Sequence, residues 1–197
     1  MKRLVVLVSG SGTNLQAIIN SIKSGELKNT VISAVISNKK EAFALKRAES
    51  ENIDAIFINP KDFKSAAEYD LKLIEIINQY KIDLIILAGY MKILTADFVN
   101  SFPNKIINIH PALLPDFGGK GMYGEKVHEA VLKSGVKESG CTVHFVTAEV
   151  DAGPIIFQER IPVIAGDTVD TLSKKILNEE HKLLVKAIKK VISQIEA

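Results

Sequence analysis

Three polar residues in two distant segments have side chains that together could stabilise a tetrahedral intermediate. Asn108 and His110 follow an apolar run, and Asp151 lies in a turn much later in the chain. An asparagine amide can donate hydrogen bonds to an oxyanion, and a histidine can hold or move a proton near neutral pH. With a carboxylate, the set can also manage the protons of such an intermediate. Asn108, His110 and Asp151 are therefore candidate catalytic residues.

The same residues also have structural interpretations. Asn108 could cap the end of a strand, and His110 could be a partly exposed residue beside it. The catalytic interpretation is favoured for both because residues two apart on a strand face the same side and can reach one ligand. Asp151 taken alone is better explained as an Asx-turn residue beside Gly153 and Pro154.

A glycine-containing turn at residues 10–14 stands between the first apolar run and the first amphipathic segment. Glycines let the backbone approach a ligand, and a helix start offers free N–H groups and a positive dipole end. Gly12, Thr13 and Asn14 are therefore candidate phosphate-binding residues, although an ordinary turn with Thr13 or Asn14 as the helix cap fits equally well. A dinucleotide fingerprint is excluded by Leu15, and a Walker loop by the lack of a Lys-Ser or Lys-Thr pair.

The remaining histidines and the single cysteine show weaker patterns. No His-Glu-x-x-His or paired-cysteine spacing is present, so a metal site built from His110, His128, His144 and Asp151 is disfavoured and no metal is expected. We expect His144 to be a hydrogen-bonded polar residue within a strand. Cys141 is disfavoured as a nucleophile because it precedes a strand and no activating base is evident.

The elements that must position these residues alternate between two hydrophobic patterns. Short apolar runs predict strands buried on both faces, and apolar residues spaced as in the stripe at 15–22 predict amphipathic helices. The predicted strands are residues 4–8, 31–36, 55–58, 84–87 and 106–109. The predicted helices are the segment at 15–22, residues 42–50 and a segment around 71–77. This alternation predicts a doubly wound α/β fold, with a mostly parallel sheet and helices on both faces.

The pattern changes after residue 110. The predicted elements of this part are a loop at 111–124, a helix at 125–134, strands at 142–146 and 155–163, and a long closing helix at 168–195. The two strands are close enough in sequence to pair as a β-hairpin. Thr168 is a candidate cap of the last helix.

Composition excludes several classes of protein. The chain has 197 residues, of which 47% are hydrophobic, so it can bury a core and is not disordered. Its 25 basic and 23 acidic residues give no electrostatic footprint for nucleic acid. One cysteine permits no internal disulfide, and no leader peptide or membrane span is recognised. We therefore expect one cytoplasmic domain over residues 1–197, a monomer or homodimer, with no nucleic-acid or membrane partner.

In this order, the segments resemble those of the phosphoribosylglycinamide formyltransferase family, over most of the chain. Residues 4–15 are similar to the first strand and phosphate loop of that family, and LAGYMKIL at 87–94 is similar to its folate-contacting segment. The most specific matches are NIHPALLP at 108–115 and GCTVHFV at 140–146 followed by DAGP at 151–154. The last two motifs together identify a formyltransferase domain.

The resemblance implies roles for the three catalytic candidates. Asn108 would bind the formyl oxygen as charge builds on it. His110 would act as the general acid, or as the imidazolium that stabilises this charge. Asp151 would pair with His110, raise its pKa and help to relay the proton of the attacking amine.

The resemblance also implies two binding sites. Gly12, Thr13 and Asn14 would hold the substrate phosphate, and Glu180 would bind the ribose hydroxyls. The folate pocket would comprise Met91, Lys92, Ile93, Leu94, Asn108, Val146 and Val150, with Lys64 as a further basic contact.

Three features depart from the pattern of that family. Lys92 stands where arginine is frequent, and lysine cannot make the same planar bidentate contact. Ala66 stands where a basic residue is frequent, and Lys64 could take its place. The stretch 116–126 is longer than usual and has Gly118 where proline is common, which leaves the role of His128 open.

The implied activity is transfer of the formyl group of 10-formyltetrahydrofolate to the amine of 5-phosphoribosylglycinamide in purine biosynthesis, with small-molecule substrates only. The alternatives are another formyltransferase, a formyltetrahydrofolate hydrolase, or a non-catalytic folate-binding module. Methionyl-tRNA formyltransferases carry a further RNA-binding domain and the hydrolases an extra N-terminal domain, and neither is expected here. The loop at 111–124 is a candidate lid over the site.

Overall fold

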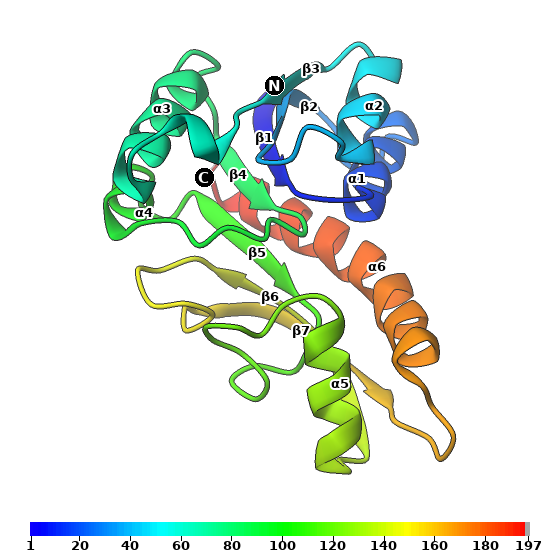
Figure 1. The fold of residues 1–197 in the computed structure, drawn as a ribbon. Coiled ribbons are helices and arrows are strands. Elements are labelled where there is room, and N and C mark those ends of the chain that lie inside the picture. Colours follow the sequence, from blue (N-terminus) through cyan, green and yellow to red (C-terminus); the bar gives the residue numbers. More distant parts are fainter. Residues whose placement is uncertain (196–197) are drawn as a thin grey trace.

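The computed structural model describes residues 1–195 of the 197-residue chain. A seven-stranded sheet forms its centre, in the order β3-β2-β1-β4-β5-β6-β7 (Figure 1). The strands are β1 (Lys2–Val8), β2 (Thr30–Ser37), β3 (Asp54–Phe57), β4 (Leu84–Leu87), β5 (Ile106–His110), β6 (Glu138–Phe145) and β7 (Ile155–Pro162). β1 to β5 are parallel, whereas β6 pairs antiparallel with both β5 and β7. The predicted mostly parallel sheet with a C-terminal hairpin is confirmed.

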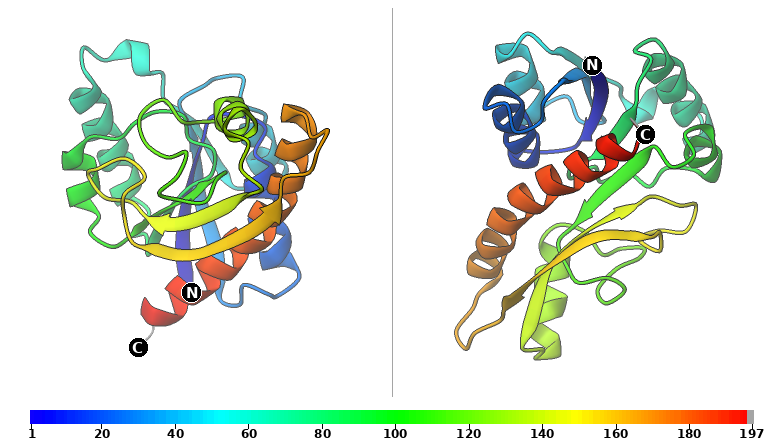
Figure 2. Two further views of the ribbon diagram at one scale, coloured as in Figure 1. Left: turned by 90° about the horizontal axis from the view of Figure 1, so that it is seen from below. Right: turned by 180° about the vertical axis from the view of Figure 1, so that it is seen from behind.

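Helices cover both faces of the sheet, as the doubly wound prediction requires (Figures 1 and 2). α3 and α4 lie over one face, and α1, α2 and α6 lie over the other. The helices are α1 (Thr13–Lys23), α2 (Phe43–Ser50), α3 (Ala66–Asn78), α4 (Ala96–Ser101), α5 (Glu125–Ser134) and α6 (Val169–Ile195), with a short 3-10 helix at Pro60–Asp62. None of the helices within residues 1–195 has the length and apolar character needed to cross a bilayer.

Each face of the sheet builds its own apolar core because side chains alternate along a strand. Val5 and Leu7 of β1 are fully buried and pack with Leu73 of α3. Leu4 and Val6 of the same strand are also fully buried, but they face the core under α1 and α6. This burial on both faces explains why the central strands consist almost entirely of valine, leucine and isoleucine.

Two short elements were not predicted from the sequence. α4 is six residues long, and the hydroxyl of Thr95 caps it by accepting a hydrogen bond from the N–H of Phe98 at 3.3 Å. The 3-10 helix has three residues and is capped by Asn59. Both are too short to show a hydrophobic period. Thr168 accepts a hydrogen bond from the N–H of Thr171 at 3.2 Å, which confirms it as the cap of α6.

The strand order creates a crevice at the middle of the sheet. From β1 the chain moves outward through α1 to β2 and β3, and it then returns through α3 to β4 on the other side of β1. The connections after β1 and β4 therefore leave toward opposite faces, which is the switch point where open α/β sheets bind ligands. The turn at 10–14 follows β1, and the predicted folate-contacting segment 87–94 begins at the last residue of β4, so both open on this crevice.

Gly140 of β6 approaches β7 too closely for a larger side chain. A Cβ atom at this position would overlap the carbonyl oxygen of Glu159 and lie 2.9 Å from Cδ2 of Leu113. We expect Gly140→Ala to lower the free energy of unfolding by about 1–3 kcal/mol, because the two paired strands must separate. The urea midpoint, measured at an unchanged m value, reports this loss.

Ser139 provides the matched control in the same strand. Its hydroxyl is buried and has no hydrogen-bond partner, so Ser139→Ala should leave the stability equal or slightly higher. If the Gly140→Ala protein unfolds at the same urea concentration as the wild type, the close approach of the two strands is disproved.

Candidate active site

A pocket of about 470 Å³ occupies the crevice at the carboxyl ends of the strands. Its walls come from the loops after β1, β4 and β5, from the segment before α5, from the turn after β6 and from one side of α6. Every residue predicted for the site lines this pocket except Lys64. Lys64 is exposed before α3, where its backbone N–H donates to Glu68 at 2.8 Å, so the structure does not bring it to the site.

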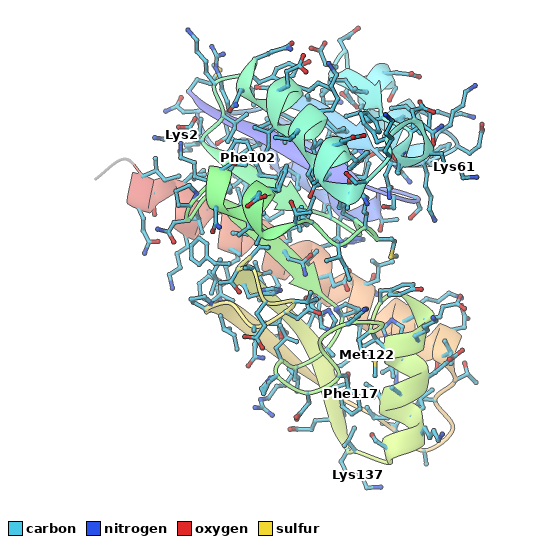
Figure 3. The ribbon with its side chains drawn as sticks, turned by 60° about the vertical axis from the view of Figure 1, so that its left-hand side comes forward. Lys2, Lys61, Phe102, Phe117, Met122 and Lys137 are labelled. Atoms are coloured by element: carbon cyan, nitrogen blue, oxygen red, sulfur yellow. The ribbon has the colours of Figure 1, made fainter. Side chains whose placement is uncertain are left out.

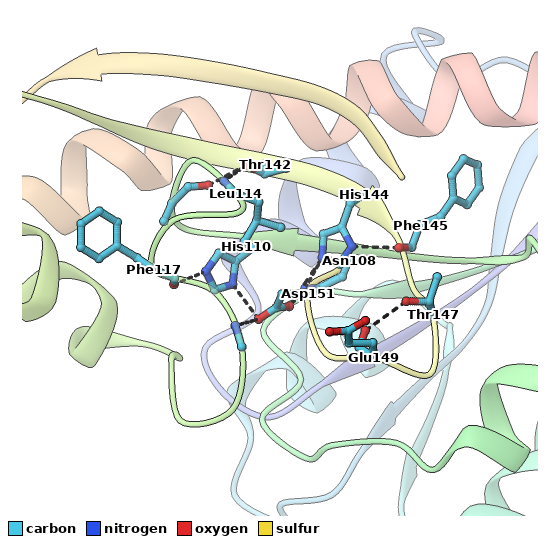
Figure 4. Close-up of polar contacts among 12 residues, drawn as sticks. Asn108, His110, Leu114, Phe117, Thr142, His144, Phe145, Thr147, Glu149 and Asp151 are labelled. Atoms are coloured by element: carbon cyan, nitrogen blue, oxygen red, sulfur yellow. Dashed lines mark hydrogen bonds and ion pairs between the residues drawn. The ribbon is translucent and has the colours of Figure 1, made fainter. Parts of the chain in front are cut away.

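Asn108, His110 and Asp151 converge on one side of the pocket (Figure 4). β5 supplies the first two residues, and the turn after β6 supplies the third. Nδ1 of His110 lies 3.7 Å from Oδ2 of Asp151, and Nδ2 of Asn108 lies 3.5 Å from Oδ1 of the same carboxylate. The side chains of Asn108 and His110 therefore meet one partner, as expected for residues two apart on a strand.

His110 is held in one orientation by the loop that follows it. Its Nε2–H donates to the carbonyl oxygen of Phe117 at 2.9 Å, so Nδ1 is the nitrogen that faces Asp151. Burial lowers the pKa of His110, the charge of Asp151 and the carbonyl of Phe117 oppose this effect, and His144 adds to it. Desolvation thus favours the neutral ring while the carboxylate favours the imidazolium, a balance that suits a group that exchanges protons.

Asp151 is anchored by groups from distant segments. Its φ angle of 56° lies in the left-handed region that aspartate tolerates. Oδ2 accepts a hydrogen bond from the N–H of Gly119 at 2.9 Å, and Oδ1 lies 3.6 Å from Nε2 of His144. Burial alone would raise the pKa of Asp151, but its contacts with His144, His110 and Gly119 lower it on balance. The carboxylate is therefore ionised at neutral pH, and its partners are distant residues rather than those of an Asx turn.

His144 belongs to this cluster although it was predicted only as a polar strand residue. It lies opposite Asn108 in the antiparallel register of β5 and β6. Its Nδ1–H donates to the carbonyl oxygen of Phe145 at 2.8 Å, and its Nε2 accepts a hydrogen bond from the amide of Asn108 at 3.2 Å. The expected hydrogen bonding is confirmed, but His144 also lines the pocket. The strand register is the signal that identifies it, and a single sequence does not show that register.

The turn at residues 10–14 starts α1 with a glycine cap. Gly12 has a φ angle of 73°, and no side chain caps the helix. A Cβ atom on Gly12 would lie 2.6 Å from Cβ of Ala44, so α2 packs against the turn and only glycine fits. The interpretation of Thr13 or Asn14 as a cap is therefore wrong. Uncapped N–H groups at the positive end of a helix are well suited to a phosphate.

Asn14 and Glu180 meet at the edge of this turn. Nδ2 of Asn14 donates to Oε2 of Glu180 at 2.8 Å, whereas Oδ1 of Asn14 is buried without a partner. Burial raises the pKa of Glu180, and the hydrogen bond from Asn14 opposes that rise. The side chain of Asn14 thus holds Glu180 of α6 beside the turn, and Gly12 and Thr13 line the pocket next to this pair.

A further part of the pocket is apolar. Met91 and Ile93 are 43% and 50% exposed, and Val150 is 36% exposed. Leu94 and Val146 line the pocket and pack on the core beneath α3. We refer to these five residues as the apolar wall. Exposed apolar side chains that face a pocket suit a flat, aromatic ligand.

Lys92 lies beside the apolar wall with its charge held in place. Its Nζ lies 5.0 Å from the centre of the Tyr69 ring, and the hydroxyls of Tyr69 and Tyr90 share a hydrogen bond of 2.7 Å. Burial raises the pKa of Tyr90, so this hydroxyl pair is neutral. The cation–π contact therefore places the ammonium charge of Lys92 at the pocket. This group cannot make the planar bidentate contact of an arginine.

The loop between β5 and α5 contacts His110 and Asp151 directly. Figure 3 shows Phe117 and Met122 on this loop, and the ring of Phe117 packs against the core under α6. The carbonyl of Phe117 contacts His110, and the N–H of Gly119 contacts Asp151. In this arrangement the loop is part of the site, because its backbone orients both His110 and Asp151.

His128 is a second pocket histidine whose role the sequence left open. It lies on the first turn of α5, is 5% exposed, and lines the pocket. Its Nδ1 is buried without a hydrogen-bond partner, and burial lowers its pKa. Within residues 1–195, no three histidine, cysteine or acidic side chains converge as ligands of a metal ion would.

Comparison with known proteins identifies the family of the chain. The family model for formyl transferases matches residues 2–188. A chloroplastic phosphoribosylglycinamide formyltransferase of Arabidopsis thaliana is 42% identical over 192 residues, covering 95% of this chain and 64% of that protein. The phosphoribosylglycinamide formyltransferase of Escherichia coli K12 is 42% identical over 180 residues, covering 91% and 82%. The trifunctional purine biosynthetic protein adenosine-3 of Gallus gallus is 44% identical over 191 residues, covering 97% and 18%.

The chain thus spans less than two thirds of the plant and chicken relatives. Among solved structures, glycinamide ribonucleotide transformylase 1 from Symbiobacterium toebii has a TM-score of 0.90 at 45% identity, covering 96% of this chain and 86% of that one. The phosphoribosylglycinamide formyltransferase of Bacillus halodurans has a TM-score of 0.91 at 34% identity, covering 98% and 97%. These likenesses confirm the predicted formyltransferase fold. Because the family model also matches nearly every residue, the chain belongs to the formyl transferase family.

Proposed function

We propose that this chain transfers the formyl group of 10-formyltetrahydrofolate to the amine of 5-phosphoribosylglycinamide, a step of purine biosynthesis. The observation that carries the proposal is the convergence of Asn108, His110 and Asp151 in a pocket that has an uncapped helix start and an apolar wall. The family implies a folate-derived one-carbon donor. Relatives named phosphoribosylglycinamide formyltransferase support the choice of acceptor.

Different parts of the pocket suit the two substrates. The start of α1 would receive the phosphate of the acceptor through backbone N–H groups and Thr13. Glu180 would accept hydrogen bonds from the ribose hydroxyls, since Asn14 holds it beside the same helix start. The apolar wall would receive the ring system of the folate, with the charge of Lys92 at its edge. One shared pocket would then bring the amine and the formyl carbon together.

The chemistry needs a binder for an oxyanion and a path for protons. The amine attacks the formyl carbon, the formyl oxygen becomes an oxyanion, and the donor nitrogen leaves after gaining a proton. Asn108 would donate to the oxyanion by giving up its long contact with Asp151, while its other N–H stays on His144. The imidazolium of His110 would stabilise the same charge. Asp151 would favour the protonated form of His110 and help to move the proton of the amine.

Three other functions would use part of this site. A hydrolase would pass the formyl group to water, and a folate-binding module would need only the pocket. The uncapped start of α1 beside the buried Asn14–Glu180 pair favours a phosphorylated acceptor over water. The His110–Asp151 pair favours an enzyme over a binding module. A formyltransferase with another acceptor would share the cluster and differ only in the molecule that meets α1.

The proposal also covers the organisation of the protein. One sheet with a core on each face supports a single formyltransferase domain over residues 1–197. We further propose small-molecule substrates, a cytoplasmic setting and a monomer or homodimer. The loop at 111–124 would close over the bound substrates, because it already contacts the catalytic cluster.

The purified protein should consume 10-formyltetrahydrofolate only when 5-phosphoribosylglycinamide is present. The measurement is the loss of formyl-folate with and without the acceptor, together with detection of the formylated product. The unphosphorylated acceptor serves as a control and should need a much higher concentration, because it lacks the group that α1 binds. Equal rates without an acceptor would indicate the hydrolase, and folate binding without turnover would indicate the binding module.

Asn108→Ala should lower kcat by about a hundredfold to a thousandfold, because it removes one oxyanion donor. Asn108→Asp should do the same, since a carboxylate of equal size accepts hydrogen bonds and donates none when ionised. Asn78→Ala, an exposed change on α3, provides the control and should leave kcat unchanged. Near-normal turnover by the alanine variant would discard the proposed role of Asn108.

Asp151→Asn should lower kcat at neutral pH by at least about tenfold and shift the alkaline limb of its pH profile to lower pH. The charge of Asp151 raises the pKa of His110 against burial, so its loss lets that pKa fall further and less imidazolium remains as the pH rises. The other groups that face His110 are His144, His128 and the carbonyl of Phe117, and this substitution leaves them in place.

Asn tolerates the left-handed backbone of position 151, so the folded structure should persist. Asp116→Asn removes the same charge from an exposed residue outside the pocket and should leave the profile unmoved. If the alkaline limb does not move in Asp151→Asn, the charge of Asp151 does not control the protonation of His110.

A further inference from the structure

Ser9 is buried between the two predicted binding segments and is not among the residues that line the pocket. It follows β1 directly and is 4% exposed. Its hydroxyl donates to Oδ1 of Asn38 at 2.6 Å and accepts a hydrogen bond from the backbone N–H of Met91 at 2.8 Å. Since the N–H of Met91 can only donate, the hydroxyl proton must point to Asn38. Both contacts therefore have a defined direction.

These contacts join the carboxyl ends of three neighbouring strands. Ser9 follows β1, Asn38 follows β2, and Met91 lies in the irregular segment 88–94 after β4. β1 pairs with both β2 and β4. The last backbone hydrogen bond between β1 and the chain that leaves β4 runs from the N–H of Ala88 to the carbonyl oxygen of Leu7, at 3.0 Å. Beyond Ala88, the hydrogen bond from the N–H of Met91 to Ser9 holds the irregular segment against the end of β1.

The segment 88–94 depends on such anchors because it has no strand or helix of its own. At its far end, the N–H of Thr95 donates to Oδ2 of the buried Asp70 at 2.6 Å. Ser9 fixes the backbone in the middle, at Met91. The side chain of Met91 is 43% exposed, so its position in the apolar wall comes from the backbone rather than from tight packing.

We propose that Ser9 is a positioning residue for the apolar wall and thereby sets the affinity for the folate. It acts through the backbone of Met91 and touches no substrate itself. The end of β1 would then serve both substrates, because residues 10–14 meet the phosphate and Ser9 places the wall that meets the folate. This inference rests on the proposed function, which assigns the wall to the folate.

Ser9→Ala tests the inference by removing a single oxygen atom. The N–H of Met91 then loses its partner, so the segment should relax and the Kd for tetrahydrofolate should rise about fivefold to twentyfold. The Kd for 5-phosphoribosylglycinamide and kcat at saturating substrates should change by less than about twofold. Ser9→Thr keeps the hydroxyl and should bring the Kd for tetrahydrofolate back toward the wild-type value.

Ser37→Ala is the matched control. Ser37 is fully buried and ends β2, the strand beside β1, but its hydroxyl bonds only within its own turn, to the backbone of Lys39. Loss of this hydroxyl should lower the stability by a similar amount while the Kd for tetrahydrofolate stays at the wild-type value. An equal rise of that Kd in both variants would show a general effect of destabilisation and overturn the inference.

Amide hydrogen exchange of Met91 separates this inference from the proposed function. In the ligand-free protein, the Met91 amide should exchange at least about tenfold faster in Ser9→Ala than in the wild type or in Ser37→Ala. Unchanged exchange, or a Kd for tetrahydrofolate within twofold of the wild type, would overturn the role of Ser9. A wild-type protein that binds no folate would instead refute the proposed function, and the exchange data would still decide whether Ser9 anchors Met91.

If Ser9→Ala does not fold, Asn38→Ala provides a milder variant. It removes the acceptor that directs the hydroxyl of Ser9 and leaves the hydroxyl itself in place. The Kd for tetrahydrofolate should then rise about twofold to fivefold, with faster exchange at Met91. No change in either quantity would count against the inference.

Discussion

The antiparallel pairing of β6 with β5 is the constraint on which the site depends. It places His144 opposite Asn108 and Thr142 opposite His110. His144 then accepts the amide of Asn108, while the hydroxyl of Thr142 bonds the backbone of residues 112–114 at 2.6 and 3.1 Å. A slip of one residue would turn these side chains to the other face of the sheet. One ladder therefore sets both the catalytic cluster and the anchor of the loop beyond it.

One ionised carboxylate faces two imidazoles within this cluster, and the hydrogen bonds of the two rings differ. Asp151 lies 3.7 Å from Nδ1 of His110 and 3.6 Å from Nε2 of His144. His144 already donates from Nδ1 to Phe145 and accepts from Asn108 at Nε2, so both of its ring nitrogens have partners. His110 donates from Nε2 and is free at Nδ1, on the side of the carboxylate. The arrangement thus leaves Nδ1 of His110 open toward the carboxylate, while His144 holds the amide of Asn108.

Residue patterns alone predicted the chemistry that lies within one element, whereas the roles of Asp151 and Glu180 came from the family resemblance. Asn108 and His110 share a strand, and the hydrophobic alternation located every strand of the sheet to within a few residues. The contacts that escaped prediction depend on packing between distant elements. His144 joins the cluster through a strand register, and the side chain of Asn14 turns to Glu180 on a helix 166 residues away. A pattern of residue types shows neither the register of the two strands nor the contact between Asn14 and Glu180.

The loop between β5 and α5 departs from the usual pattern of the family at residues 116–126, and it still contributes to the site. It contacts the catalytic pair through backbone atoms, the carbonyl of Phe117 and the N–H of Gly119. Such contacts require a conformation rather than particular side chains. The left-handed backbone of Phe117 costs on the order of 1–3 kcal/mol, which the packing of its ring against the core can offset. Gly118 fits where a larger residue would not, since a Cβ atom there would lie 2.5 Å from Cδ2 of Leu114 and 3.3 Å from Cβ of Asp151. One apolar anchor and two glycines therefore hold the end of the loop that meets the site, and the hydroxyl of Thr142 holds its beginning at residues 112–114.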